Sequence, residues 1–381
     1  MKVLHAFNQP RSGGGSLAST LATIDISRKN GIEVDVFTRD SSDLPSGLRG
    51  KVQASISAFY APGSLKAFAR QLDKFKPDIV HANELFPLLS PEIFRLCKKS
   101  GIPVVVTCDD YHLTCPVRTH YRQGEICTDC MKKSEFQAVA KNCRGDIPES
   151  VINAMYNAWV RKRGYFQECV DQFITCSEFS REWLVEHVGL DRESVTAIPH
   201  AIQIPPERAD PRRGEYVSFG GRFVPEKGID VLLAAGERSA LPISLSRNEK
   251  HFVTIDLPQN ANVVVTKGRE DLAEFYRGAR FLVMPSTWFE TYGVVGAESM
   301  SHGIPVIASR LGALENLIED GVDGLLFEPG NVDDLAEKME SLWGDPERLV
   351  TMGEAARQKA IDKWSPEVNF RQTLEVYRRL A

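Results

Sequence analysis

Residues 285–298 read Pro-Ser-Thr-Trp-Phe-Glu-Thr-Tyr-Gly-Val-Val-Gly-Ala-Glu, and His-Gly-Ile-Pro-Val follows at residues 302–306. The order predicts a strand, a loop, a helix that starts near Gly293, and a further strand after the Gly-Ile-Pro sequence. Backbone N–H groups and the helix dipole at such a helix start suit phosphate or hydroxyl oxygens. Glu290 and Glu298 are therefore either ordinary acids near a helix start or two carboxylates that hold separate polyols.

A second informative segment lies at residues 220–228, which read Gly-Gly-Arg-Phe-Val-Pro-Glu-Lys-Gly. It directly follows a run expected to form a strand at residues 216–219, so it would lie at the carboxyl end of that strand. Open α/β sheets bind their ligands at this end, and glycines let a ligand approach the backbone. Arg222 and Lys227 are either solvated surface charges or a pair of cations that suits a diphosphate.

Short β-branched runs alternate with segments of helical length through most of the chain, which is typical of βαβ units and a parallel sheet. The expected strands are Val3–Phe7, Val34–Thr38, Ile79–Ala82, Val104–Thr107, Phe173–Cys176, Tyr216–Phe219, Val263–Thr266, Arg280–Met284, Val306–Ala308 and Leu325–Phe327. The pattern pauses at a polar, Cys-rich and basic stretch at about residues 115–163, which we interpret as a flap. Prolines at residues 199–211 indicate a hinge between two α/β domains. Three glycines at residues 13–15 form either a tight turn or a ligand-binding loop.

The composition limits the possible classes of function. The 381 residues carry a formal net charge of −5, and 43% of them are hydrophobic. This suits two domain cores and gives no reason to expect a nucleic-acid partner. The chain opens on a strand-like run rather than a secretory signal, and no apolar run approaches the roughly 18 residues of a membrane span. We therefore expect a cytoplasmic protein, with peripheral contact at the inner face of the membrane as an open alternative.

These segments together resemble the retaining glycosyltransferases of the GT-B fold that carry a Glu-x7-Glu motif, known as glycosyltransferase family four and glycosyl transferases group 1. The similarity extends over nearly the whole chain. It rests on the early glycine loop, Asp78-Ile-Val-His81-Ala, residues 220–228, Glu290 to Ala308, and the stretch from Gly312 to Leu326.

The resemblance implies an α/β protein with two Rossmann-like, doubly wound parallel-sheet domains that face each other across a cleft. An acceptor-side domain would occupy residues 1–203, with the flap at about 115–163. A nucleotide-sugar-binding domain would occupy residues 204–363. The family ends in a helix that crosses back to the first domain, and residues 364–381 are expected to form it.

The resemblance also implies the roles of individual residues. Arg222 and Lys227 would neutralise the departing diphosphate, Glu290 would hold the donor sugar, and Glu298 would hold the ribose hydroxyls. Fixed positive groups stabilise the charge that develops on a leaving diphosphate, so no catalytic metal or cofactor is expected. The donor-binding set is Gly14, Gly15, Arg222, Lys227, Glu290, Thr291, Tyr292, Gly293 and Glu298. The acceptor-side candidates are His81, Asp110 and His112, and both histidines are otherwise ordinary structural residues.

Three positions depart from the family pattern. Asp109 stands where the family has a histidine that faces the reacting sugar, so it is either a catalytic proton acceptor or charge stabiliser, or an inert replacement. The linker reads Pro199-His200-Ala201 where Pro-Asn-Gly is usual. Residues 241–262 lack the family's glycine-rich turn, which puts the contacts to the nucleotide base in question.

The flap has its own motif, in which four cysteines follow the spacing Cys-x11-Cys-x2-Cys-x12-Cys. These are Cys115, Cys127, Cys130 and Cys143. The short central spacing is typical of zinc knuckles, so the four are either ligands of a structural zinc ion or buried thiols. Basic and aromatic residues follow at 154–166. They form either a surface for an acceptor diphosphate or an anionic membrane, or a domain helix with a solvated charged end.

We therefore expect a retaining, metal-independent hexosyltransferase that moves a sugar from a nucleotide-diphosphate sugar to a saccharide or lipid-linked acceptor. The resemblance places the reaction in polysaccharide or cell-envelope glycan synthesis. Two alternatives stay open: a nucleotide-sugar epimerase of the same fold, and a non-catalytic nucleotide-sugar-binding protein. The base and sugar of the donor, the acceptor and the linkage depend on the shape of the pocket rather than on these motifs.

Overall fold

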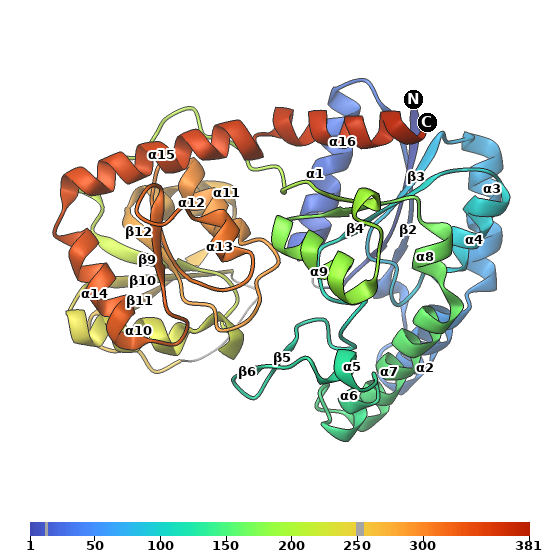
Figure 1. The fold of residues 1–381 in the computed structure, drawn as a ribbon, viewed down its shortest axis with the longest axis horizontal. Coiled ribbons are helices and arrows are strands. Elements are labelled where there is room, and N and C mark those ends of the chain that lie inside the picture. Colours follow the sequence, from blue (N-terminus) through green and yellow to red (C-terminus); the bar gives the residue numbers. More distant parts are fainter. Residues whose placement is uncertain (12–13, 249–254) are drawn as a thin grey trace. The chain divides into compact units, whose positions relative to one another are not determined.

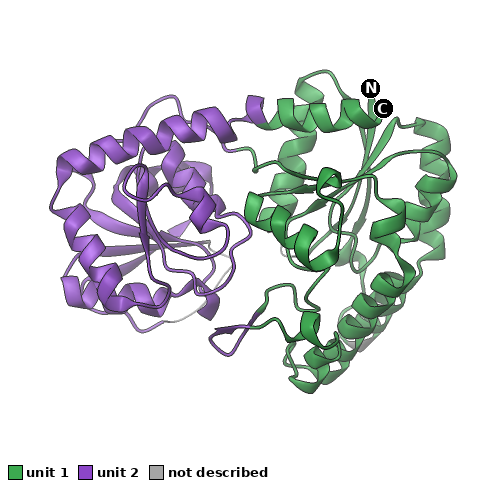
Figure 2. Ribbon diagram, in the orientation of Figure 1, with its two compact units in different colours: residues 1–120, 127–201, 369–381 green, residues 121–126, 202–368 purple. Residues whose placement is uncertain are grey.

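The computed structural model describes residues 1–11, 14–248 and 255–381, and the chain forms two compact units (Figure 2). Unit 1 consists of residues 1–120, 127–201 and 369–381, and unit 2 consists of residues 121–126 and 202–368. Each unit contains a six-stranded sheet whose strand pairs are all parallel. The expected fold class of two parallel-sheet α/β domains is confirmed.

The sheet of unit 1 has the strand order β2-β1-β3-β4-β7-β8. Figure 1 labels its strands β2, β3 and β4. Its strands are β1 (Lys2–Gln9), β2 (Glu33–Asp40), β3 (Ile79–Ala82), β4 (Val104–Cys108), β7 (Gln172–Thr175) and β8 (Val195–Ala197). Successive side chains of a strand point to opposite faces, and both faces are buried here. Leu4 and Val80 belong to one apolar cluster, whereas Val3 and Ile79 belong to another. This explains why the strands read as nearly continuous apolar runs.

Helices connect these strands and cover the sheet. The helices of unit 1 are α1 (Gly15–Lys29), α2 (Leu48–Phe59), α3 (Pro62–Phe75), α4 (Glu92–Lys99), α7 (Ile147–Arg163), α8 (Tyr165–Cys169) and α9 (Glu178–Val188). The last helix of the chain, α16 (Pro366–Leu380), contributes its residues from Asn369 onward to unit 1. Its Val376 and Tyr377 pack in the same apolar cluster as Val3 and Ile79. The end of the chain therefore belongs to the core of the amino-terminal unit.

The sheet of unit 2 has the strand order β11-β10-β9-β12-β13-β14. Its strands are β9 (Tyr216–Gly220), β10 (Ile243–Asn248), β11 (Ala261–Thr266), β12 (Ala279–Met284), β13 (Val306–Ser309) and β14 (Gly324–Phe327). Its helices are α10 (Ile229–Ser239), α11 (Arg269–Arg277), α12 (Val294–Ser301), α13 (Leu314–Leu317), α14 (Val332–Trp343) and α15 (Pro346–Trp364). The chain order reverses between β9 and β12, and doubly wound sheets bind ligands at the carboxyl ends of strands at such a reversal.

Within the two six-stranded sheets, two strands, β8 and β10, are not among those that the sequence predicts. In β10, Ile243 and Leu245 alternate with Ser244 and Ser246, and all four are buried. The serines interrupt the apolar run that marks the other central strands. β8 is only three residues long, which is too short to give a periodic signal. Part of the stretch at 241–262, which lacks the family's glycine-rich turn, lies outside the described residues, at 249–254.

The flap contains a small antiparallel hairpin of β5 (Tyr121–Arg122) and β6 (Glu125–Ile126), and two short helices, α5 (Asp129–Lys132) and α6 (Gln137–Ala140). The longer α7 follows, and its Tyr156 and Trp159 pack against the main apolar core of unit 1. This packing agrees with the interpretation of the aromatic and basic segment as a domain helix. No helix within the described ranges is both long and apolar enough to cross a membrane.

Candidate functional site

The loops after β9 and β12 form the first part of the candidate site, in unit 2. The two strands are neighbours in the sheet, so their carboxyl ends bring the two loops together despite the distance in sequence. The backbone N–H of Thr287 donates a hydrogen bond of 3.0 Å to the carbonyl of Glu226, which ties one loop to the other. The motifs that the sequence singled out thus meet at one edge of this sheet.

Lys227 and Glu290 form an ion pair at the centre of this edge. The Nζ atom of Lys227 lies 2.5 Å from Oε1 of Glu290, and the Ser286 hydroxyl donates a 2.6 Å hydrogen bond to the same oxygen. Burial acts to raise the pKa of Glu290, but the charge and hydrogen bond of Lys227 and the bond from Ser286 outweigh it and lower the pKa. A fixed, ionised carboxylate therefore lies beside a fixed cation.

Glu298 lies within α12 and has a different environment. The Tyr276 hydroxyl donates a hydrogen bond of 3.1 Å to its Oε2 atom. Burial raises the pKa of Glu298, and the hydrogen bond from Tyr276 and the charge of Arg269 only reduce this rise. The first turn of α12 contains no acidic residue, and no side chain caps the helix. The interpretation of Glu290 and Glu298 as ordinary helix-start acids is therefore wrong for this structure.

Glycines shape the backbone around these side chains. Gly293 directly precedes α12, so the helix starts where the sequence predicts, and its φ of 100° is one that favours glycine. Gly228 has φ of 65°, and a Cβ atom there would lie 1.9 Å from the Pro285 carbonyl oxygen. The two loops approach each other this closely only because residue 228 has no side chain. Thr291 is half-buried, while the Tyr292 ring is buried and lies 6.3 Å from the Trp364 ring.

Arg222 is the more exposed of the two cations. Its side chain is 54% exposed, and its guanidinium lies 3.7 Å from Oε1 of Glu226. Exposed pairs at this distance contribute little to stability, so the guanidinium can turn toward an anion at low cost. The Lys227 side chain is held by its buried ion pair with Glu290, whereas the Arg222 side chain is free to reorient. The pair thus offers one preorganised and one adaptable positive charge.

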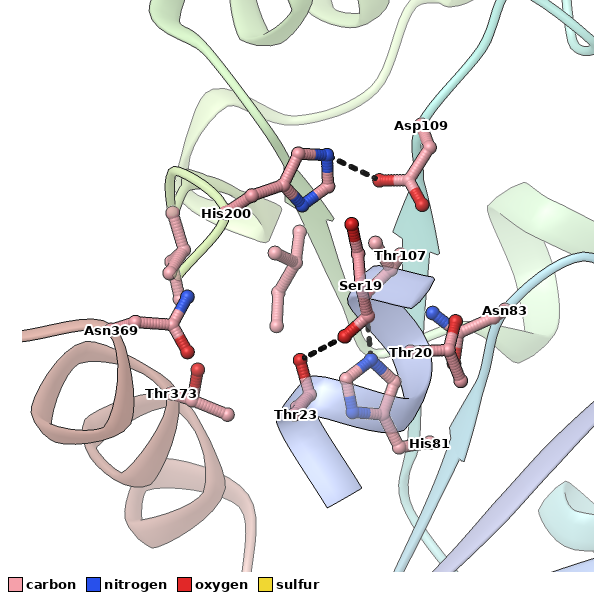
Figure 3. Close-up of a pocket in the computed structure, with 12 residues that line it drawn as sticks. Ser19, Thr20, Thr23, His81, Asn83, Thr107, Asp109, His200, Asn369 and Thr373 are labelled. Atoms are coloured by element: carbon pink, nitrogen blue, oxygen red, sulfur yellow. Dashed lines mark hydrogen bonds and ion pairs between the residues drawn. The ribbon is translucent and has the colours of Figure 1, made fainter. Parts of the chain in front are cut away.

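The second part of the candidate site is a cavity within unit 1, with a volume of about 30 Å³ (Figure 3). Its wall is mostly polar and comes from α1, from α16 and from the carboxyl ends of the strands. The lining residues are Ser19, Thr20, Thr23, His81, Asn83, Thr107, Asp109, Ile174, Ile198, His200, Asn369 and Thr373. The expected catalytic Asp109 and acceptor-side His81 therefore share one cavity. Oδ2 of Asp109 accepts a 2.9 Å hydrogen bond from the Ser16 hydroxyl.

His81 is fixed in the wall of this cavity by two hydrogen bonds. Its Nδ1 atom lies 2.6 Å from the Tyr377 hydroxyl, and its Nε2 atom lies 2.7 Å from the Thr107 hydroxyl. Burial lowers the pKa of His81 to about 3, so its ring is neutral at neutral pH. The neutral ring links β3, β4 and α16. This favours the structural reading of His81.

Tyr377→Phe is expected to destabilise unit 1 by about 1–3 kcal/mol, because a buried ring nitrogen of His81 loses its partner. The free energy of unfolding from urea denaturation measures this loss. The matched control is Tyr60→Phe, which removes a hydroxyl from a side chain that is 57% exposed. Equal stability of the two variants would show that the bond to His81 does not help to hold α16 in place.

Asp110 and His112 form a separate cluster beside that cavity. His112 donates its backbone N–H to Oδ1 of Asp110 at 2.9 Å, and its ring Nδ1 lies 2.6 Å from the same oxygen. Arg118 lies 3.3 Å from Oδ2 of Asp110 and also pairs with Glu84. Burial acts to raise the pKa of Asp110, but His112 and Arg118 outweigh it and lower the pKa strongly. His112 and Arg118, with Glu84 and Phe86, line a second small cavity, whereas Asp110 does not.

The glycine loop leads into α1. Gly14 has φ of 142°, and Gly15 begins the helix. A Cβ atom at either position would meet no atom within 4 Å, so packing does not require glycine there. Ser12 and Gly13 of this loop lie outside the described residues. Ser16, in the first turn of α1, donates a hydrogen bond to Asp109, which lines the cavity.

The flap cysteines lie in one region of unit 1 but do not converge tightly. Burial, with the nearby Cys115, Cys143 and Cys127, raises the pKa of Cys130 to about 12. In the described part of the chain, these four do not bring three ligand atoms within 4.8 Å of one another. Zinc binding by the flap stays a prediction.

Three basic residues around the flap are paired with acids. The pairs are Arg161–Glu135, Lys141–Asp129 and Arg144–Glu149. These pairs reduce the positive charge that the flap can present to an anionic partner. Contact with a membrane or an acceptor diphosphate stays a prediction.

Known families match both halves of the chain. Residues 14–204 match the model described as Glycosyltransferase Family 4, and residues 203–359 match the model of Glycosyl transferases group 1. The chain belongs to glycosyltransferase family 4. It is 37% identical to a D-inositol 3-phosphate glycosyltransferase of Kribbella flavida, over 97% of this chain and 92% of that protein. An uncharacterized glycosyltransferase of Methanocaldococcus jannaschii is 34% identical over 44% of this chain, and the matched part spans 50% of that protein.

Solved structures share the fold of this family 4 member. Sucrose-phosphate synthase from Thermosynechococcus elongatus superimposes with a TM-score of 0.73 at 19% identity, over 100% of this chain and 98% of that one. HepE of Anabaena, solved in complex with UDP-glucose, gives a TM-score of 0.67 at 16% identity, with all of both chains covered. At these identities the likeness shows the fold alone, and it agrees with the GT-B architecture expected from the sequence.

Three residues that complete the candidate site of this family member, Ser286, Tyr276 and His200, were not identified as site residues from the sequence. Ser286 lies in the same loop as Glu290, four residues earlier, and this proximity is a usable local signal. Tyr276 gives no such signal, because α11 and α12 meet only in the folded unit. His200 is visible in the sequence only as a departure in the linker, and its place beside Asp109 depends on the tertiary structure.

Proposed function

We propose that this family member transfers a sugar from a nucleotide-diphosphate sugar to a saccharide or lipid-linked acceptor, with retention of the anomeric configuration. The observation that carries the proposal is the buried ion pair of Lys227 and Glu290, with Arg222 beside it at the carboxyl ends of β9 and β12. Breaking a sugar–phosphate bond places negative charge on the leaving diphosphate. Lys227 supplies a fixed positive charge for it and Arg222 an adaptable one, so the leaving group needs no metal ion.

The two carboxylates suit two different parts of the donor. Glu290 is kept ionised by Lys227 and accepts hydrogen bonds, which suits the hydroxyls of the donor sugar. Glu298 is less strongly ionised because of its burial, and with Tyr276 it suits the ribose hydroxyls. Since Glu290 is already engaged by Lys227 and Ser286, it is a poor nucleophile. We therefore propose front-side attack, in which the leaving phosphate takes up the proton of the acceptor hydroxyl.

The relatives suggest which compounds to test first. HepE of Anabaena has been solved with UDP-glucose, so UDP-glucose is the first donor. Several relatives are named D-inositol 3-phosphate glycosyltransferases, so phosphorylated polyols belong in the acceptor panel beside saccharides and lipid-linked sugars. A place in polysaccharide or cell-envelope synthesis, at the inner face of the membrane, is part of the proposal.

We expect nucleotide release from one member of a donor panel of uridine, guanosine, adenosine and thymidine diphosphate sugars. Arg222→Ala should lower this release by about 10²–10³-fold, the range observed for the loss of a single electrostatic donor at an active site. Glu298→Ala should also lower the release, because it removes the acceptor proposed for the ribose hydroxyls. The matched control for the arginine is Arg213→Ala, whose side chain is 87% exposed and lies in the same unit. The anomeric configuration of the product, determined by NMR, tests retention.

Other outcomes of the same experiment would favour the alternatives. An altered nucleotide sugar formed without an acceptor would identify an epimerase. Tight donor binding without nucleotide release, across all acceptors, would identify a non-catalytic binding protein. Equal loss of release in Arg213→Ala and Arg222→Ala would show that the position of Arg222 has no special role.

A further inference from the structure

Three neighbouring strands of unit 1 bring together Asp109, Cys176 and His200. Asp109 directly follows β4, Cys176 directly follows β7, and His200 lies shortly after β8. These strands are adjacent and parallel, so their carboxyl ends meet at one edge of the sheet. One carboxylate oxygen, the thiol sulfur and one imidazole nitrogen all lie within 4.8 Å of one another. Three ligand types thus converge from three separate segments.

The distance between Asp109 and His200 is informative. Oδ1 of Asp109 lies 3.6 Å from Nε2 of His200, and Figure 3 shows the ring and the carboxylate pointing toward each other. This separation is too long for a direct hydrogen bond. Zinc–nitrogen and zinc–oxygen bonds of about 2.0–2.2 Å, at a tetrahedral angle, place the two ligand atoms about 3.3–3.6 Å apart. The observed distance matches two ligands of one ion.

Asp109 also has an unsatisfied oxygen. Its Oδ2 accepts the hydrogen bond from Ser16, but its Oδ1 is buried and has no hydrogen-bond partner in the described structure. A buried carboxylate oxygen without a partner is costly. A cation between Asp109 and His200 removes this cost, because it replaces the lost hydration of the oxygen.

We propose that Asp109, Cys176 and His200 form a binding site for a divalent transition-metal ion, with Zn²⁺ as the occupant. One thiolate, one imidazole and one carboxylate are ligand types that zinc prefers. The thiol of Cys176 loses its proton to solvent on binding. The resulting thiolate and the Asp109 carboxylate together balance the charge of the ion. This site differs in residues and position from the four cysteines of the flap.

The fourth position of the ion faces a cavity. Asp109 and His200 line the cavity of about 30 Å³ described above, beside Ser19 and Thr107. A polar cavity of this size holds a water molecule. Three protein ligands and one solvent ligand give an open site, unlike the closed four-ligand sites with a purely structural role. The inference concerns unit 1 alone and does not depend on the donor site in unit 2.

Metal binding tests the proposal directly. Untagged protein of residues 1–381, freed of metal by a chelator, is titrated with Co²⁺ as a spectroscopic probe for the zinc site. We expect one equivalent that depends on His200, with the visible absorption of tetrahedral Co²⁺ and a sulfur-to-cobalt charge-transfer band; any equivalent bound by the flap should depend on Cys127 instead. His200→Gln and Cys176→Ser should each weaken this equivalent by about 100-fold or more, because even the loss of an outer-shell partner costs 10–100-fold. Cys176→Ser should also abolish the charge-transfer band of the equivalent that depends on His200.

Two control variants separate this site from other metal ligands. His187→Gln replaces a histidine of the same unit that is not one of the three proposed ligands. Cys127→Ser replaces one of the four cysteines of the flap. Both should retain the equivalent that depends on His200. Circular dichroism checks that the variants fold. If His200→Gln removes no bound Co²⁺, the proposal is overturned. It is also overturned if the charge-transfer band disappears only in Cys127→Ser. Since no donor is present, either result leaves the proposed transfer reaction untouched.

Discussion

Lys227→Met should lower the rate of nucleotide release by about 10²–10³-fold, because it removes a preorganised charge opposite the developing charge of the diphosphate. Methionine keeps most of the apolar stem, so packing changes little. The same change should alter the pH dependence. Burial acts to raise the pKa of Glu290, and the charge and hydrogen bond of Lys227, with a smaller contribution from Ser286, lower it. In the variant the effect of burial is larger than the remaining stabilisation, so the pKa of Glu290 rises. Activity that needs ionised Glu290 should then be lost at a higher pH than in the wild type when the solution is acidified.

The measurement is kcat for nucleotide release as a function of pH, in the wild type and in the variant. Lys338→Met is the matched control, because Lys338 pairs with Asp334 at 3.4 Å within α14 of the same unit. This control should leave both the rate and the acid limb unchanged. A Lys227→Met variant with a wild-type acid limb would show that the ion pair does not set the charge of Glu290.

Gly228→Ala should destabilise unit 2 by about 2–5 kcal/mol, from two separate causes. The residue has φ of 65°, a left-handed conformation that costs alanine about 1–2 kcal/mol. Its Cβ atom would also lie 1.9 Å from the Pro285 carbonyl oxygen, so the loops after β9 and β12 must separate. Because Lys227 is the preceding residue, the variant should lose donor binding as well as stability.

Gly330→Ala isolates the first of these causes. Gly330 belongs to the same unit and has φ of 76°, but a Cβ atom there would meet nothing within 4 Å. It should therefore pay only the conformational cost and keep donor binding. Thermal denaturation midpoints compare the two variants, and hydrogen exchange in β9 and β12 locates the effect. Equal midpoints would mean that the close approach of the two loops does not contribute to stability.

The candidate donor site was largely predictable from the sequence, because its main residues belong to short continuous motifs. Gly293 at the start of α12 follows from the local pattern of strand, loop and helix. Lys227 follows from a glycine-rich strand end. The pairing of Lys227 with Glu290 required knowledge that β9 and β12 are neighbours, which no local pattern contains. The expected roles on the donor stay predictions until a donor is bound.

The unit 1 cavity was much less predictable. In the sequence, Asp109 and His200 are two unrelated departures from the family pattern, and nothing distinguishes Cys176. Their convergence follows from the order β4-β7-β8, in which β8 is too short to be recognised as a strand. Likewise, nothing in the local sequence indicates that Tyr377 near the end of the chain bonds to His81 near its beginning.

The sequence by itself determined the two α/β folds and the motifs at the strand ends. These depend on the periodicity of apolar side chains and on the backbone freedom of glycine, which are local properties. The tertiary structure alone decided which strand ends lie side by side, and hence that Lys227 meets Glu290 and that Asp109 meets His200. Strand order depends on how whole faces pack over long sequence separations, and a local window of residues does not contain that information.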